Sequence, residues 1–433
     1  MTASVESNTN KENRPKRAFA THTPKWQKFQ PKLMVPSGKA ANVVSKQATE
    51  IYAYNRQYSH VYSLRLAVLN RRIWKTMAED SAYKRIDRVL ELRENVPSMI
   101  VGTLVKEAED ADEPPIQPET ECRPSDQLFL EDESGRVALK VENVHQYCTG
   151  VVMGVKGKVD KTGTLQVEEM VPPRQAPSPT LSGHTTPSDP SSHAPHLLLV
   201  SSLLCGDPNV SSVPREMLIS YLQGQFTDDA AKVSRVLLAG AGPSSQDPLQ
   251  GIKELDVFGL ELSRCGIPLD IMPSKDDPTT ANWPQRPLHS SLLPNASNIV
   301  HRATNPYAAG HGEKLVVATD GVNIYDLQKR VLTERKERLT ELQALEQTLE
   351  WSHICPTGPD SVPTVPHVDL DPMVLEQKPH LYLCGNAQSF ATTKTEDGTT
   401  LLCVPKFSET GEAVLVNLET MAVELLRFED NES

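Results

Sequence analysis

The chain has 433 residues, which is enough for two or three domains with buried cores. Its 44 Lys and Arg against 56 Asp and Glu give a net charge of −12. An acidic chain repels phosphate backbones, which argues against an autonomous nucleic-acid binder. The sequence contains no apolar run of ~18–20 residues, so we expect no membrane span.

Seven cysteines and 34 prolines narrow the class further. The cysteines are dispersed and none forms a Cys-x-x-Cys pair, which disfavours a zinc or iron–sulfur site in this chain. We therefore expect no bound cofactor. The N-terminal segment lacks the apolar core of a signal peptide. Together with the dispersed cysteines, this is typical of a protein in a reducing compartment. The prolines exceed the usual ~5% and indicate linkers between folded blocks.

Residues 1–49 are predicted to form a disordered basic tail. Residues 1–50 contain nine Lys or Arg, only three Glu and few large apolar residues. Lys11–Arg17 fits a nuclear-import signal, and a solvated tail without that role is the alternative.

Residues 50–95 are predicted to form an N-terminal helical segment. One set of large side chains recurs at spacings of three and four, as on one face of a helix: Tyr58, Val61, Tyr62, Leu66, Leu69 and Ile73. Tyr58 and Tyr62 combine an apolar body with a polar tip, which suits docking on a partner. Packing of this face on the chain itself remains the alternative.

Residues 96–171 are predicted to form a small β-barrel, and residues 172–196 a linker. About five short strands fall within this stretch, with turns at Glu133–Gly135 and Asp160–Gly163, and an OB-fold is the commonest such barrel. The barrel has few aromatic residues and many acids, so a protein contact or spacer role is favoured over strand binding. The linker holds seven Pro and eight Ser or Thr in 25 positions.

Residues 197–429 are predicted to form a large α/β domain. Leu197–Ser201, Val236–Gly240 and Leu381–Gly385 are short, wholly apolar strands that end in small residues, as in a sheet covered on both faces. A leucine stripe predicts one helix over Gln328–Trp351. Loops that carry chemistry gather at the strand ends of such sheets.

The order of these loops resembles the calcineurin-like metallophosphoesterases, in which strand-end Asp, Asn and His residues hold two metal ions. In this chain those positions are degenerate, and they are occupied by Ser202, Leu204, Ala241, Lys275, Asp276, His353, Asn386 and Gln388. Leu and Ala offer no donor atom, and Lys275 brings a positive charge, so two divalent ions should not bind. We therefore predict an inactivated fold without catalytic or metal-binding residues.

Many separate segments, in the same order, resemble the B-subunit family of replicative DNA polymerases, in particular its DNA polymerase delta branch. The segments are Arg56–Tyr62, Leu128–Glu133, Val233–Gly240, Pro268–Pro273, Asp277-Pro278, Pro284–His289, Thr304–Tyr307, His353–Asp360, Pro379–Asn386, Val404–Ser408 and Val416–Leu418. Gly310–Asp326 departs from the family's strand–turn–helix pattern.

The resemblance implies a multidomain α+β protein, with an OB-fold barrel joined to an inactivated calcineurin-like phosphoesterase α/β sandwich. It implies a nuclear, non-enzymatic scaffold in DNA replication and repair synthesis. The implied partners are the cysteine-rich C-terminal module of the catalytic subunit of DNA polymerase delta and a third accessory subunit, with the sliding clamp and DNA reached indirectly.

Two other functions stay open at this point. One is a metal-dependent phosphoesterase or nuclease, which metal-dependent degradation of an oligonucleotide would reveal. The other is a single-strand binder acting through the barrel, which salt-sensitive binding would reveal. The residues that contact partners are unknown, apart from Tyr58 and Tyr62 as candidates.

Overall fold

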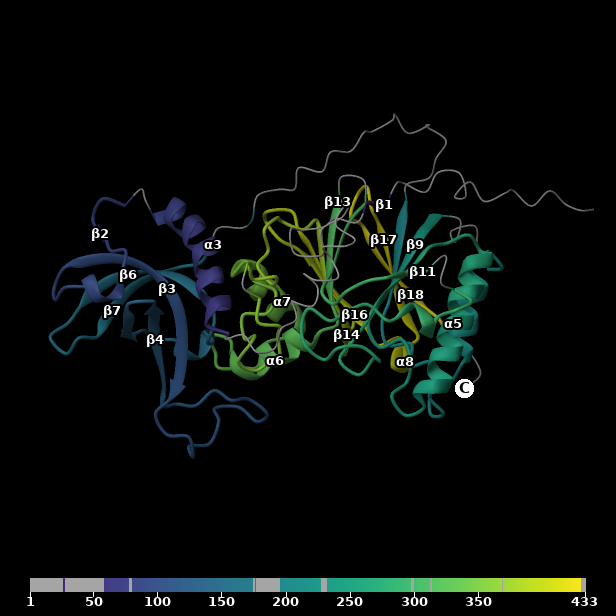
Figure 1. Ribbon diagram of the computed structural model, residues 1–433, viewed down its shortest axis with the longest axis horizontal. Helices are drawn as coiled ribbons and strands as arrows, with labels where there is room; N and C mark the ends of the chain where they lie inside the picture. Colours follow the sequence, from purple (N-terminus) through teal and green to yellow (C-terminus); the bar gives the residue numbers. More distant parts are fainter. Residues whose placement is uncertain are drawn as a thin grey trace, which may run out of the picture.

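The structure is a computed structural model, shown in Figure 1. It describes residues 26–27, 58–77, 80–173, 176, 195–226, 232–296, 300–311, 314–367 and 369–429. The predicted tail with Lys11–Arg17, apart from 26–27, and most of the predicted linker lie outside these residues. Within the described part of the chain, no helix is both long and apolar enough to cross a membrane.

Helix α3 (Ser59–Met77) confirms the predicted amphipathic helix, and its apolar face packs on the chain itself. Leu69, Ile73 and Met77 are buried against strands of the neighbouring barrel. Gly154 of the barrel makes this close approach possible, because a Cβ there would lie 2.3 Å from the Met77 sulfur.

The six strands next in the chain form the predicted barrel (Figure 1, left). They are β2 (Lys84–Arg85), β3 (Pro97–Ala108), β4 (Asp126–Asp132), β5 (Gly135–Lys140), β6 (Val152–Val159) and β7 (Leu165–Val171). Their order is β2-β3-β4-β5-β7-β6, and β3 also pairs with β6, which closes the sheet on itself. Short 3-10 turns, η1 (Val89–Glu91) and η2 (Val144–Gln146), lie beside it.

The large unit contains two six-stranded sheets. The first has the order β1 (Trp26–Gln27), β12 (Tyr307–His311), β13 (Lys314–Thr319), β14 (Leu381–Ala387), β16 (Thr400–Pro405) and β15 (Ala391–Lys394). The second has the order β11 (Val300–Arg302), β10 (Leu269–Met272), β9 (Val233–Ala239), β8 (His196–Val200), β17 (Glu412–Asn417) and β18 (Val423–Arg427). Leucine and valine side chains from both sheets form one buried cluster, so the sheets pack face to face.

Helices flank these sheets (Figure 1). They are α4 (Val213–Leu222), α5 (Pro248–Arg264), α6 (Val322–Arg330), α7 (Glu341–Glu350), α8 (Phe407–Thr410) and the 3-10 turn η4 (Ser290–Leu292). The strand β13 followed by α6 supplies a strand–turn–helix in the region where the sequence departs from the family pattern.

The single helix predicted over Gln328–Trp351 is wrong, because two helices separated by a tight loop occupy this stretch. Thr340 accepts a hydrogen bond from the Gln343 amide, and the Gln343 side chain accepts one from the Thr340 amide, so a capping box starts α7 there. In the loop, Leu332 donates its backbone N–H to the His145 carbonyl of the barrel at 2.9 Å. The leucines recur at helical spacing because both helices and the loop between them bury their leucines. This spacing therefore gives no sign that the helix is interrupted between α6 and α7.

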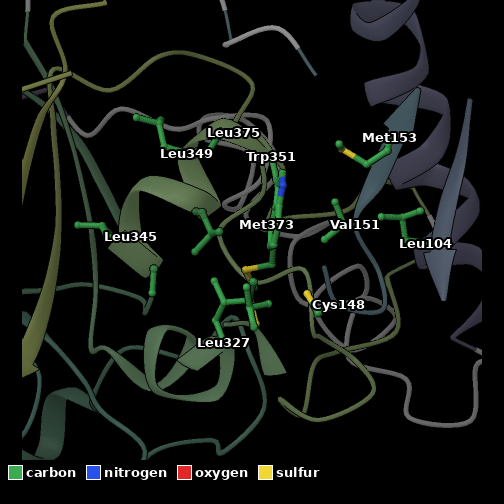
Figure 2. Packing of buried hydrophobic residues seen from close by; sticks show 14 of the residues in the cluster. Leu104, Cys148, Val151, Met153, Leu327, Leu345, Leu349, Trp351, Met373 and Leu375 are labelled. Carbon is green, nitrogen blue, oxygen red and sulfur yellow. The ribbon is translucent and has the colours of Figure 1, made fainter. Parts of the chain in front are cut away.

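The barrel and the large unit share one hydrophobic core. Figure 2 shows Trp351 between Met373 of the large unit and Val151 of the barrel, and the indole is only 1% exposed. Beside this core lies the buried guanidinium of Arg65 on α3. Its Nε is 2.7 Å from Asp371 Oδ2, and its other nitrogens donate to three carbonyl oxygens, at Gly150, Pro356 and Gly358.

Replacing Arg65 with alanine should lower the free energy of unfolding by about 3–5 kcal/mol, because a buried carboxylate and three carbonyls lose their partner. Arg71→Ala, on the exposed side of the same helix, is the matched control and should change it by less than about 0.5 kcal/mol. Denaturant unfolding of both variants measures this. Equal effects of the two substitutions would contradict the role given to Arg65.

Candidate functional site

The strand-end loops of both sheets meet at one place. Asn386, near the end of β14, donates its backbone N–H to Ser201 Oγ, after β8, at 2.7 Å. Its side-chain Nδ2 donates to the Asp320 carbonyl, after β13, at 2.9 Å. Ser201 Oγ also donates to the Ala239 carbonyl of β9 at 2.9 Å. The polar groups here are hydrogen-bonded to one another across the two sheets.

Three of the predicted degenerate positions, Ser202, Leu204 and Ala241, lie in adjacent loops. Ser202 donates its backbone N–H to the Gly240 carbonyl at 3.0 Å, and Leu204 donates to the Ala241 carbonyl at 3.2 Å. All three have positive φ angles, 55°, 45° and 53°, which is uncommon for residues other than glycine. These loops therefore have a strained backbone conformation, but the side chains of Leu204 and Ala241 in them have no atom that could bind a metal ion.

The space between the loops is narrow at Gly240. A Cβ there would lie 3.1 Å from the Cβ atoms of both Asp320 and Ser274, and 3.2 Å from Asn386 Nδ2. Glycine at this position lets the loops after β9, β10 and β13 approach one another and the end of β14 closely.

The acidic residues of the site differ from those predicted. Lys275 and Asp276 are exposed, whereas Asp277 and Asp320 are buried. Asp277 Oδ2 accepts the Ser274 N–H at 2.7 Å, and Asp320 Oδ2 accepts the Lys275 N–H at 3.2 Å. The sequence analysis did not identify Asp320. It could have done so, because Asp320-Gly321 directly follows the apolar strand β13, which is where loop residues of a site are expected.

Burial raises the pKa of both carboxyl groups. The pKa of Asp277 rises to about 7, with the nearby charge of Asp320 as a further cause. Burial raises the pKa of Asp320 to about 6, partly offset by hydrogen bonds from neighbouring groups. The two buried carboxyl groups therefore favour a partly protonated state near neutral pH.

His353 and Gln388 lie in other surroundings. His353 Nε2 is 2.9 Å from Asp371 Oδ2, the carboxylate that also pairs with Arg65. We call these three buried side chains, which lie beside the barrel, the Arg65 cluster. Burial lowers the pKa of the His353 imidazole to about 4. Gln388 donates its backbone N–H to the Glu341 carboxylate of α7. Among the hydrogen bonds of the described residues, none joins His353 to the other seven predicted positions.

The two candidate docking tyrosines differ. Tyr62 is half-buried, with the Arg65 guanidinium 5.3 Å from its ring centroid. Burial, followed by a hydrogen bond with Asp360, raises its pKa, so its hydroxyl faces its own chain. Tyr58, at the start of α3, remains 40% exposed and is accessible to a partner.

Comparisons with known proteins agree with this architecture. A family model described as DNA polymerase delta subunit OB-fold domain matches residues 57–170, and one that describes the B subunit of DNA polymerase alpha/epsilon matches residues 198–392. The DNA polymerase delta small subunit of Oryza sativa subsp. japonica is 30% identical over 86% of this chain and 93% of its own length. The chain belongs to the family of DNA polymerase delta small subunits.

Two further relatives in the family show the same extent of similarity. The DNA polymerase delta small subunit of Arabidopsis thaliana is 30% identical over 86% of this chain and 91% of that protein. DNA polymerase delta subunit 2 of Drosophila melanogaster is 30% identical over 87% of this chain and 94% of that protein. The similarity spans both the barrel and the two-sheet unit.

The buried carboxyl pair predicts a particular pH dependence of stability. The unfolded Asp277 has a pKa of ~3.9, whereas in the folded chain it is about 7, so the folded state holds a proton that the unfolded chain has released. This contribution to stability is present below pH ~4 and is lost as the pH rises toward 7.

The wild-type chain should therefore lose stability between about pH 4 and about pH 7, and Asp277→Asn should not show this loss. Over that range, the free energy of unfolding of the variant should rise relative to wild type by on the order of 1–4 kcal/mol. Denaturant unfolding of both proteins across the range measures the difference, with exposed Asp276→Asn as control. A pH-independent difference would contradict the raised pKa.

Proposed function

We propose that this chain is a non-catalytic scaffold subunit of nuclear DNA polymerase delta. It binds the cysteine-rich C-terminal module of the catalytic subunit and a third accessory subunit, and through them it is connected to the sliding clamp and DNA. The observation that carries the proposal is that a member of this family has apolar or internally bonded side chains at the strand ends. Leu204 and Ala241 stand there without donor atoms, and Asn386 is hydrogen-bonded to Ser201 and Asp320.

The proposal includes an inactivated phosphoesterase-like fold for residues 197–429. It is supported by two packed six-stranded sheets with flanking helices, and by positive φ angles at the loop tips that contain Ser202, Ala241 and Asn386. We place the OB-fold at residues 96–171, behind the helical segment 50–95 and the tail 1–49, with 172–196 as the linker. The end of β7 at Val171 and the start of β8 at His196 support the last two boundaries.

A scaffold role also suits the joint between the two folded units. The shared core around Trp351 and the Arg65 cluster fix the barrel against the large unit. A partner that contacts both units therefore meets a preformed surface, and little ordering free energy is spent on binding.

Co-expression with the cysteine-rich module of the catalytic subunit should give a complex that co-elutes in size-exclusion chromatography. An obligate subunit contact buries more than ~2,000 Å² and should survive gel filtration. Tyr58→Ala tests the exposed tyrosine, with Tyr325→Ala, also exposed, as the matched control. Separate elution of the wild-type chain would contradict the scaffold role.

The purified chain should not degrade a single-stranded oligonucleotide in the presence of Mn²⁺, because its strand-end side chains cannot position two ions. Degradation that is abolished both by a chelator and by Asp320→Asn would reveal a metal-dependent nuclease instead. His353→Ala serves as a second control, since the imidazole lies in the Arg65 cluster.

A further inference from the structure

The C-terminal half of α3 and the strand β2 form a basic surface on this acidic protein. Residues 71–93 contain seven Lys or Arg against four Asp or Glu, whereas the whole chain has 44 against 56. Figure 1 draws both elements beside the strands of the barrel. The charge of the chain is thus unevenly distributed, and its excess of acid lies elsewhere.

Five side chains define what we call the α3–β2 surface: Arg71, Trp74, Lys75, Lys84 and Arg85. Arg71 and Lys75 lie four residues apart on the helix face opposite to the buried Leu69 and Ile73, and Trp74 lies at the edge of that face, where it also packs against the cluster that contains Leu69 and Ile73. The other two form β2, which is the edge strand beside β3. Arg85 joins the two elements, because its Cζ lies 4.2 Å from the centroid of the Trp74 ring.

The cations of the α3–β2 surface are available to an external anion. Arg71, Lys75, Lys84 and Arg85 are exposed, and Trp74 is half-buried. Arg85 pairs with Asp87 at 2.9 Å, and both side chains are more than half exposed, at 56% and 68%, so this pair is weak. Among the described residues, no ion pair involves Arg71, Lys75 or Lys84.

The arrangement of a guanidinium over an indole selects between anionic partners. An acidic peptide requires only charge, whereas the guanidinium of Arg85, which lies over the Trp74 ring, is a planar group on which an unpaired base can stack. Neighbouring lysines and arginines that neutralise phosphates, together with stacking groups, are the combination used for single strands. In a duplex the bases already stack on one another and cannot use this face.

We propose that the α3–β2 surface binds single-stranded DNA directly, through phosphate contacts of Arg71 and Lys75 and base stacking on the Arg85–Trp74 pair. This contact goes beyond the scaffold role, which requires no DNA contact by this chain. It also differs from strand binding by the barrel groove, because the side chains come from α3 and the edge strand.

The test is fluorescence anisotropy of a labelled single-stranded oligonucleotide with the full chain over a range of salt concentrations. Arg71→Ala with Lys75→Ala should weaken binding about tenfold at low salt and reduce the slope of log affinity against log salt by about 1–1.5. The matched control, Lys161→Ala with Lys394→Ala, removes two exposed charges elsewhere and should leave both quantities near wild type. Both variants keep the basic residues of 1–50, so binding through these residues cancels in the comparison.

A second measurement tests the stack. The oligonucleotide should quench tryptophan fluorescence in a Trp26→Phe background, and adding Trp74→Phe should remove most of this quenching, since the other two tryptophans, Trp283 and Trp351, are each only 1% exposed. Thermal unfolding of each variant verifies folding. The proposal would be overturned by equal affinity and salt slope in the two double variants, by equally strong binding of a duplex, or by complete competition from polyglutamate.

Discussion

The buried guanidinium of Arg65 is the contact on which the arrangement of the two folded units depends. It lies on α3, yet its nitrogens donate four hydrogen bonds, to Asp371, to a barrel carbonyl at Gly150 and to two carbonyls of the loop that follows Trp351. The charge-assisted bond to Asp371 and the three bonds to carbonyl oxygens together offset the desolvation of the two ions. His353 shares the same carboxylate and stays neutral, since burial lowers the pKa of its imidazole to about 4.

This arrangement explains why an imidazole in a family-typical motif has no role at the strand ends. The motif that begins at His353 contributes to the joint between barrel and large unit, together with Trp351 and Met373. At the strand ends, several residues have positive φ angles and the polar groups are hydrogen-bonded to one another. These strand ends are compatible with the proposed scaffold role, because function depends on the site and its surfaces rather than on the architecture alone.

The sequence predicted the barrel strands, the amphipathic helix and most strands of the large unit, because alternation and apolar runs follow directly from burial. It failed where local rules compete. The break between α6 and α7 depends on the capping box at Thr340 and on a backbone bond to His145 of the barrel, and neither changes the leucine spacing. The degenerate loops were predicted from their residue types, but the placement of Asp277 inside and Asp276 outside depends on a turn that one sequence does not specify.

The central claim is that the strand ends cannot hold a pair of metal ions. A crystal of the chain soaked in Mn²⁺, with anomalous diffraction recorded, tests it most directly. The account predicts no anomalous peak between the loops that carry Ser202, Ala241, Asp320 and Asn386. Two strong peaks there, about 3.5–4 Å apart and bound by these loops, would contradict it and reassign the chain as a metal-dependent hydrolase.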